Sequence, residues 1–275
     1  MITISCCIPG GSFMPEGEGK ISITPYERLT FGYQVITSLG YDRVEATVGL
    51  VAQLSDDDRK KLVDARNAGS FRLDVCNSLI GLPIVTDEEG TKAVHAYLDT
   101  VFSQMAELGV KIVVFGSGRA RSIPEGTDRA EGEKKLDAFL EYADGLCEKY
   151  DMTLVIEPLN KRETNWVNTV AQGAEVVRRL NLPHIRLLAD GFHMACEGED
   201  PAVMAENGDI LLHTHLAAAP DRVYPGKCGG EYETKFLRTL LGMGYDGCVT
   251  VECGFSDFAS EAKLASGFMK AVLGR

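Results

Sequence analysis

Eight short apolar runs rich in β-branched residues recur along the whole of this chain, and stretches of a different periodicity separate them. The runs begin at Ile2, Arg43, Phe71, Lys111, Thr153, Ile185, Ile210 and Cys248. Between them the apolar residues are spaced three and four apart, as in 91–109 and 133–150, which is typical of amphipathic helices. Strands that alternate with helices predict right-handed βαβ units and a parallel sheet.

The number of these units distinguishes two parallel architectures. Eight units without a low-complexity linker predict a single (β/α)8 TIM barrel over residues 1–275, since a barrel can reach this length as one domain. An open doubly wound sheet is the alternative. A nucleotide-binding sheet would need a G-x-G-x-x-G fingerprint after its first strand, and the segment 9–19 has neither that spacing nor a helix behind it.

Composition excludes several classes of partner. With 28 Lys and Arg against 40 Asp and Glu, the net charge is −12, and such a surface repels nucleic acid. No stretch approaches the ~20 apolar residues of a membrane span, and the N-terminal segment lacks the basic region of a secretion signal. The eight cysteines form no C-x-x-C pair, which predicts reduced, structural thiols in a cytoplasmic protein that binds no membrane.

Ionisable side chains interrupt the apolar runs at their carboxyl ends in the second half of the chain. They are Glu157, Asp190, His215 and Glu252. In a parallel barrel the reacting groups gather at that end, and three carboxylates buried together need a cation. Any one of them could cap a helix or pair with an arginine, but four on consecutive strands indicate a divalent metal site. Three carboxylates and one imidazole suit Mn²⁺ or Mg²⁺, with Co²⁺ also acceptable.

The other histidines differ in their expected roles. His213 stands two residues before His215 and faces the same side of the strand, so we expect a hydrogen-bonded residue one layer below the metal ligand. His95 lies in an amphipathic stretch and His184 in a turn, where surface or loop roles are expected. His193 follows Asp190 by three residues and could reach a bound ligand without binding the metal, although it could equally be a helix-start residue.

Two glutamates beside a divalent metal indicate proton transfer next to a carbonyl group. The metal would hold a hydroxyl and the adjacent carbonyl oxygen of a sugar and stabilise the enediolate. One glutamate would remove the carbon-bound proton and the other would return it. Return to the neighbouring carbon is an aldose–ketose isomerisation, and return to the opposite face of the same carbon is an epimerisation. Neither reaction needs an organic cofactor.

Several motifs resemble those of the sugar phosphate isomerase/epimerase superfamily, the xylose-isomerase-like TIM barrels that include ketose 3-epimerases and hydroxypyruvate isomerases. These motifs are VIEPLN, LLADGFH, HTHLAAAPDRVYPG and VTVECG. VVFGSGRARSIPEG from Val113 is similar to the family's loop after strand four, and YDRVEATVGLVAQLS from Tyr41 to its strand-two glutamate and helix start. The resemblance covers essentially the whole chain. It implies a 3-epimerase of a ketose or ketose phosphate that works through a cis-enediolate, as a homodimer or homotetramer.

The resemblance also implies a role for each candidate residue. The metal ligands would be Glu157, Asp190, His215 and Glu252. Glu157 and Glu252 would also be the acid/base pair, and His193 and Arg222 would contact the sugar. This chain departs from the family in having three alanines at 217–219, where a carboxylate is usual, and in placing Arg222 one residue further on. A plain salt bridge is the structural alternative for Arg222.

Other loop residues have two interpretations each. Gly118 replaces a usual proline in the loop after strand four, where Arg119 and Arg121 add positive charge. These arginines could hold a substrate phosphate or anchor the loop. Trp166 and Phe13 could wall off the site or only pack within their loops.

Three other functions use the same barrel. An abasic-site endonuclease would need extra histidines on early strands, where this chain has Glu45, Asn77 and Phe115. A lyase of the inosose dehydratase type begins with the same enolate chemistry but expels water, and the sequence does not separate it from an epimerase. A non-catalytic sugar-binding barrel is disfavoured because both acid/base glutamates are present.

Overall fold

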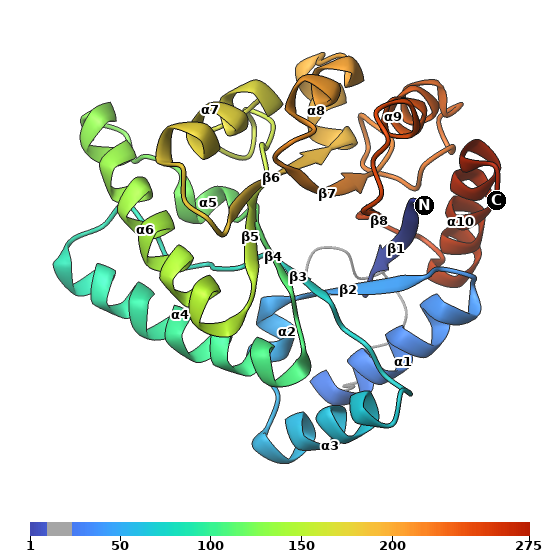
Figure 1. Ribbon diagram of the computed structural model, residues 1–275, viewed down its shortest axis with the longest axis horizontal. Coiled ribbons are helices and arrows are strands. Elements are labelled where there is room, and N and C mark those ends of the chain that lie inside the picture. Colours follow the sequence, from blue (N-terminus) through green and yellow to red (C-terminus); the bar gives the residue numbers. More distant parts are fainter. Residues whose placement is uncertain (10–23) are drawn as a thin grey trace.

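The strands close into a barrel in the computed structural model, which describes residues 1–9 and 24–275. Within these residues, eight parallel strands pair in chain order, and β1 also pairs with β8 (Figure 1). The strands are β1 (Thr3–Cys7), β2 (Arg43–Thr47), β3 (Val75–Asn77), β4 (Ile112–Phe115), β5 (Thr153–Ile156), β6 (Ile185–Asp190), β7 (Leu211–Leu216) and β8 (Cys248–Val251). This closure confirms the predicted (β/α)8 barrel and excludes the open sheet.

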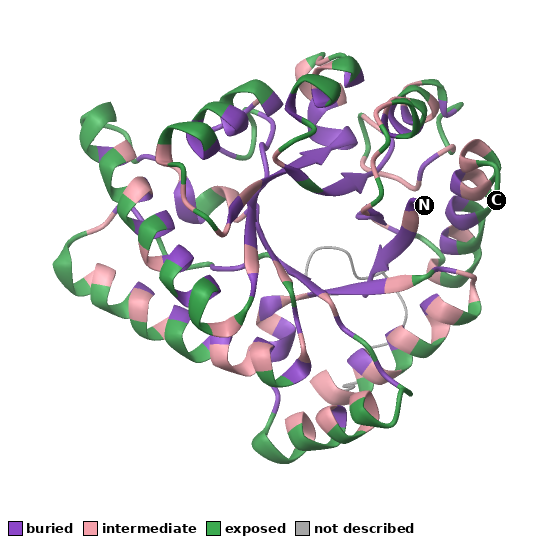
Figure 2. Ribbon diagram, in the orientation of Figure 1, coloured by how far each residue is buried: buried purple, intermediate pink, exposed green. Residues whose placement is uncertain are grey.

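Helices form the outer wall of the barrel. They are α1 (Pro25–Ser38), α2 (Val48–Ala52), α3 (Asp56–Asn67), α4 (Glu88–Leu108), α5 (Gly118–Arg121), α6 (Arg129–Tyr150), α7 (Val170–Leu180), α8 (Gly191–Glu197), the 3-10 helix η2 (Pro201–Asn207), α9 (Glu231–Gly242) and α10 (Phe258–Leu273). In α4, for example, Val94, Leu98, Val101 and Met105 are buried at intervals of three and four residues. Figure 2 shows the buried strands inside this ring and the exposed residues on its outer side.

The strand alternation decides which residues reach the inside of the barrel. A small apolar cluster fills part of the interior, apart from the core between strands and helices: Val75, Val114, Val155 and Leu188. Two positions further along the chain, and therefore on the same face of each strand, are Asn77, Gly116, Glu157 and Asp190. The period of two therefore places three polar side chains, those of Asn77, Glu157 and Asp190, and Gly116 next to the apolar cluster on the side of the carboxyl end of the barrel.

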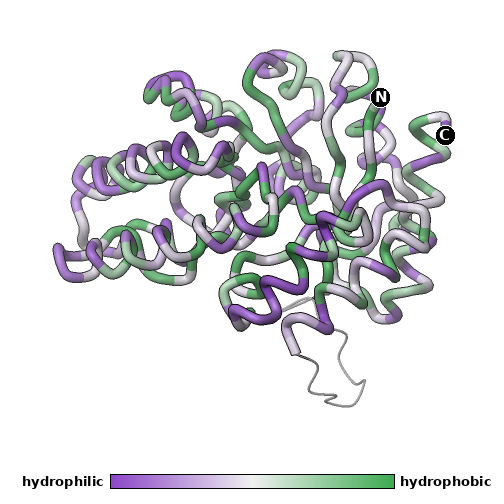
Figure 3. Tube along the Cα trace, turned by 60° about the horizontal axis from the view of Figure 1, so that its bottom comes forward, coloured by the Kyte–Doolittle hydropathy of each residue, from purple (hydrophilic) through white to green (hydrophobic). Residues whose placement is uncertain are grey.

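The surface and the cysteines follow the predicted pattern. Hydropathy alternates along the outer helices (Figure 3), and none of the helices in the described ranges combines the length and apolar character needed to cross a membrane. The cysteines are all unpaired, and six of the eight are buried. Burial raises the pKa of Cys147 to about 12, so this thiol is unreactive at neutral pH. The prediction of structural thiols is confirmed for the buried six, whereas Cys196 is partly exposed and Cys228 is exposed.

Asp42 ties the first strand to the last residue at the amino end of the barrel. Its Oδ2 accepts a hydrogen bond from the backbone N–H of Ile4 at 2.8 Å, and its two oxygens pair with Arg275 at 2.7 and 2.8 Å. The hydrogen bonds from Arg275 lower the pKa of Asp42 below its ordinary value, against the opposing effect of partial burial.

We expect Asp42→Asn to lower the free energy of unfolding by about 1 kcal/mol at pH 7, because a bidentate but partly solvated pair is lost. Because the pKa of Asp42 is lower in the folded than in the unfolded protein, its carboxylate stabilises the fold at pH values above the unfolded-state pKa. This stabilisation is lost as the pH falls through the folded-state pKa. The difference from wild type should therefore shrink below about pH 4. Urea unfolding at pH 7 and pH 3 measures it, with Asp209→Asn as the exposed control. An equal difference at both pH values would contradict this account.

Candidate functional site

Four ionisable side chains meet at the carboxyl ends of β5 to β8. Each is buried and offers one ligand atom, and these four atoms lie within 4.8 Å of one another: Glu157, Asp190, His215 and Glu252. Asp190 ends β6 and His215 lies one residue before the end of β7, whereas Glu157 and Glu252 follow directly after β5 and β8. The structure thus brings together the four residues that were predicted to be metal ligands; they are called the carboxylate cluster below.

The carboxylate cluster concentrates negative charge around one imidazole. His215 Nδ1 lies 3.1 Å from Glu157 Oε1 and 3.4 Å from Glu252 Oε2. Among the described residues, Asp190 Oδ2 is buried without a hydrogen-bond partner. Burial, together with Glu157 and Glu252 and against the effect of Arg222, raises the pKa of Asp190 to about 7. A buried oxygen without a partner among hard donors fits a divalent cation, which would favour the ionised form of Asp190.

Below the carboxylate cluster, Glu45 of β2 bridges two histidines. Its Oε1 lies 3.0 Å from His215 Nε2 and its Oε2 lies 2.9 Å from His213 Nε2, and all three side chains are fully buried. Although burial acts in the opposite direction, the two histidines lower the pKa of Glu45 below its ordinary value. Because Nε2 of His215 faces a carboxylate, Nδ1 is turned toward the carboxylate cluster. His213 lies one layer down with a hydrogen-bond partner, as the sequence predicted.

Glu252 is held from two sides. Asn77 Nδ2, at the end of β3, donates to Glu252 Oε1 at 3.1 Å, and Arg222 donates to Glu252 Oε2. Burial acts to raise the pKa of Glu252, but Arg222 and His215 outweigh it and lower this pKa to about 2. Glu252 is therefore ionised at neutral pH and can accept a proton.

His193, from α8, is a buried hydrogen-bond donor beside the carboxylate cluster. The backbone N–H of Asn160 donates to its Nδ1 at 3.2 Å, so Nδ1 carries no proton and the neutral ring has its proton on Nε2. Burial, followed by the charge of Arg222, lowers the pKa of His193 well below its ordinary value. His193 Nε2 lies 3.4 Å from Asp190 Oδ2 and, among the described residues, is buried without a hydrogen-bond partner.

Arg222 reaches the carboxylate cluster despite its displaced sequence position. Its loop is closed by two backbone hydrogen bonds between Ala218 and Val223, of 2.8 and 3.2 Å, and Arg222 itself takes a φ of 52°. This tight loop directs the guanidinium to Glu252 and places Nη2 3.7 Å from Asp190 Oδ2. The salt bridge of Arg222 is therefore part of the site and not an isolated surface pair.

Glu163 is a residue that sequence reasoning missed. Its Oε1 accepts a hydrogen bond from Asn160 Nδ2 at 3.1 Å and lies 3.6 Å from Arg222 Nη1. The side chain is 40% exposed, so it can be reached from solvent. Glu163 stands in the irregular segment between β5 and α7, where no periodicity indicates which way a side chain points.

The remaining loop residues have packing roles where they are described. Trp166 is buried, with its ring centroid 6.3 Å from that of Phe115 at the end of β4, so it packs against the neighbouring strand. Arg121 is fully buried and anchors its loop, which excludes contact with a substrate phosphate, and Arg119 is exposed. Phe13 lies outside the described residues.

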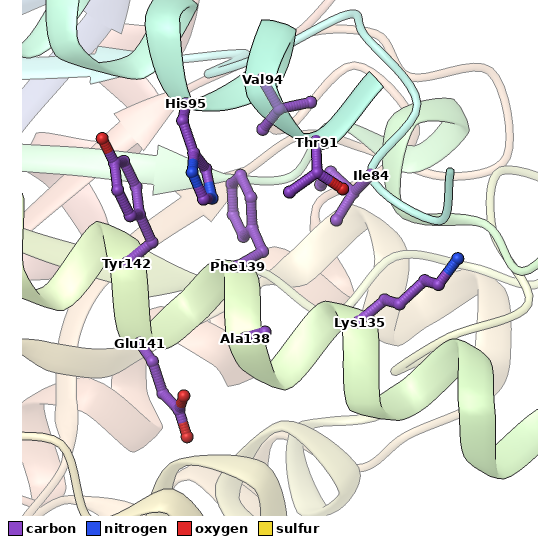
Figure 4. Close-up of a pocket in the computed structure, with 9 residues that line it drawn as sticks. All are labelled: Ile84, Thr91, Val94, His95, Lys135, Ala138, Phe139, Glu141 and Tyr142. Atoms are coloured by element: carbon purple, nitrogen blue, oxygen red, sulfur yellow. The ribbon is translucent and has the colours of Figure 1, made fainter. Parts of the chain in front are cut away.

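A hollow between α4 and α6 is separate from the carboxylate cluster (Figure 4). It is lined by Ile84, Thr91, Val94, His95, Lys135, Ala138, Phe139, Glu141 and Tyr142. The rings of His95 and Tyr142 stack with centroids 3.6 Å apart, and the Tyr142 hydroxyl donates to Asp99 at 2.9 Å. His95 thus lies partly exposed on the outer side of the barrel and joins two helices there, in agreement with the surface role predicted for it.

Comparison with known proteins places these residues in context. Residues 33–271 match the family described as xylose isomerase-like TIM barrel. A probable ketose 3-epimerase of Synechocystis sp. is 30% identical over 224 residues, which cover 78% of this chain and 74% of the relative. A putative hydroxypyruvate isomerase of Mus musculus is 28% identical over 141 residues, 48% of this chain and 51% of the relative. The solved D-allulose 3-epimerase from Methylomonas sp. in complex with D-allulose has the same fold, with a TM-score of 0.81 at 17% identity over 98% of this chain and 96% of that one.

Proposed function

The chain belongs to the xylose isomerase-like TIM barrel family and is an isomerase of that fold, and we propose that it is a metal-dependent 3-epimerase of a ketose or ketose phosphate. The observation that carries this proposal is the pair of glutamates on either side of His215, with Nδ1 at 3.1 Å from Glu157 and 3.4 Å from Glu252. Epimerisation needs two proton-transfer groups beside one substrate carbon, and this pair supplies them. The likeness to the Synechocystis ketose 3-epimerase supports the same reaction.

We infer that the carboxylate cluster binds one divalent ion, Mn²⁺ or Mg²⁺, with Co²⁺ also acceptable. Three carboxylates and an imidazole without a thiolate form a hard donor set, and Asp190 Oδ2 is a buried oxygen that needs a partner. When bound, the ion would stabilise the negative charge of a substrate enediolate and so acidify the carbon-bound proton. The pairing of Glu45 with His215 prepares Nδ1 as a ligand atom.

The protein's own residues would move and hold the protons. Glu252 is ionised and, with Glu157, would remove the C3 proton from one face and return a proton to the other. The Nε2–H group of His193 and the guanidinium of Arg222 would donate to substrate oxygens and stabilise the charge that develops there. His193 lies in α8, directly after β6, and Arg222 lies in the segment between β7 and α9.

The direct test is incubation of the protein with Mn²⁺ and a panel of free and phosphorylated ketoses in deuterated water. We expect one ketose to gain a single deuterium at C3 and to be converted into its C3 epimer. An aldose product with deuterium on the neighbouring carbon would instead identify an aldose–ketose or hydroxypyruvate isomerase, and loss of water would identify a lyase of the inosose dehydratase type. If none of the sugars in the panel gained deuterium from the solvent, the proposal would be contradicted.

Gly116 gives a second test because its missing side chain makes room for Glu157. A Cβ at position 116 would overlap with Glu157 Oε2, whereas a Cβ at the exposed helical position Gly145 has no described atom within 4 Å. We expect Gly116→Ala to lower kcat and Mn²⁺ affinity at least tenfold, since small displacements of reacting groups reduce rates strongly. Gly145→Ala is the matched control and should keep both values. Wild-type kinetics in Gly116→Ala would show that the position of Glu157 is not critical.

A further inference from the structure

Among the fully buried residues that the structure describes, Arg121 has the largest side chain, although arginine is rarely buried. Its guanidinium carbon lies 5.5 Å from the ring centroid of Phe115 and 5.5 Å from that of Trp166. Burial lowers the pKa of Arg121 to about 10, so the group is still charged at neutral pH. Its two hydrogen bonds go to backbone carbonyls and not to carboxylates. Burial of a charge without a paired carboxylate costs free energy, which indicates that this arginine has a specific function.

The guanidinium of Arg121 links the carboxyl ends of the neighbouring strands β4 and β5, directly beside Glu157. Nη1 donates to the carbonyl of Phe115, the last residue of β4, at 2.8 Å, and Nη2 donates to the carbonyl of Glu157 at 2.6 Å. The backbone N–H of Glu157 also donates to the Phe115 carbonyl, at 3.2 Å. A planar fork with two fixed N–H directions suits this double contact, and a lysine ammonium does not reproduce it.

The rest of the same loop fits closely against the segment that follows Glu157. A Cβ on Gly118 would lie 2.7 Å from the carbonyl oxygen of Glu163. Asn165 then exchanges two hydrogen bonds with the backbone of Ile123, of 2.9 and 2.8 Å. The loop after β4 therefore fixes the backbone of both glutamates of the next loop, Glu157 and Glu163.

We propose that Arg121 is a positioning residue that holds Glu157 in the geometry of the reaction. Its charge also attracts the carboxylates of Glu157 and Glu163. This inference rests on the proposed function, because it takes Glu157 as the acid/base residue and metal ligand. The side chain itself touches no substrate, since Arg121 is 0% exposed.

The test compares Arg121→Lys and Arg121→Met with Arg179→Lys, in which the arginine pairs with Asp137 on the surface. We expect both Arg121 variants to lose at least tenfold in kcat with KM within about threefold of wild type, because a positioning role acts on the reacting group. Their Mn²⁺ affinity, measured by electron paramagnetic resonance without any sugar, should also fall at least tenfold. A folded Arg121 variant with wild-type kcat and Mn²⁺ affinity would overturn the proposal.

Asn165→Ala keeps the proposal testable if the Arg121 variants do not fold. It removes the two partly buried hydrogen bonds to Ile123, and we expect kcat and Mn²⁺ affinity to fall three- to tenfold. If the Arg121 variants do not fold and Asn165→Ala binds Mn²⁺ and turns over as wild type does, the proposal is overturned. Mn²⁺ affinity is read without sugar, so a protein that epimerises no ketose would refute the proposed function while this comparison still decides the role of Arg121.

Discussion

Replacement of either Glu157 or Glu252 by glutamine is expected to lower kcat by about 10³-fold or more, since a positioned acid or base contributes about 10²–10⁴-fold and each glutamate is also a metal ligand in our proposal. Glutamine keeps the shape of the side chain but cannot exchange a proton. The fold should be retained, because glutamine keeps the backbone hydrogen bonds that Glu157 and Glu252 donate to the neighbouring strands β4 and β7. Steady-state kinetics with the ketose identified in the panel give the measurement.

Deuterium exchange separates the two glutamates. A variant that has lost only the group that returns the proton can still remove it, so each variant should exchange deuterium into one epimer and not into the other. Glu148→Gln on the exposed side of α6 is the control and should behave as wild type. Full activity in either Glu157→Gln or Glu252→Gln would refute the two-glutamate mechanism.

Removal of the metal is expected to have an effect of similar size. Treatment with a chelator should abolish turnover, and Mn²⁺ should restore it. Because the proposed site exists only in the folded state, Mn²⁺ at 100 times its Kd should add about 2.7 kcal/mol to the free energy of unfolding. Urea unfolding with and without Mn²⁺ measures this gain.

Asp190→Asn should lose that gain at the same Mn²⁺ concentration. Without metal, however, the variant should be at least as stable as wild type, because it removes one of three neighbouring carboxylates and Asn Oδ1 can still accept the N–H of Phe192. Asp209→Asn on the surface is the control, with the wild-type response to Mn²⁺ expected. A metal-free Asp190→Asn protein that is clearly less stable than metal-free wild type would contradict the electrostatic reading of this cluster.

The residues of the carboxylate cluster were predictable because two regular patterns converge on them. A parallel barrel collects the carboxyl ends of its strands, and side chains two apart share a face, so a charged residue that follows an apolar strand residue by two must reach the same end. Glu157 stands two after Val155 and Asp190 two after Leu188, in agreement with this rule. The same rule placed His213 below His215.

Glu45 and Asn77 carried the same signal and were still overlooked as site residues. Each lies on an early strand, Glu45 within β2 and Asn77 at the end of β3, and each interrupts an apolar environment. Glu163 and Asn160 carried no such signal, because their segment has no repeating geometry. The burial of Arg121 was also beyond sequence reasoning, since it depends on two aromatic rings from separate elements, Phe115 and Trp166.

The layer formed by Glu45 and His213 limits how the site can be moved to another protein. His215 is oriented by Glu45, and Glu45 is in turn shared with His213, which also lies 3.3 Å from the hydroxyl of Thr250. If only the four residues of the carboxylate cluster were grafted onto a different barrel, nothing would hold Nε2 of His215. The imidazole could then turn Nε2 instead of Nδ1 toward the proposed metal ion. The smallest transferable unit therefore has two layers, and the lower layer consists of the fully buried Glu45 of β2 and His213 of β7.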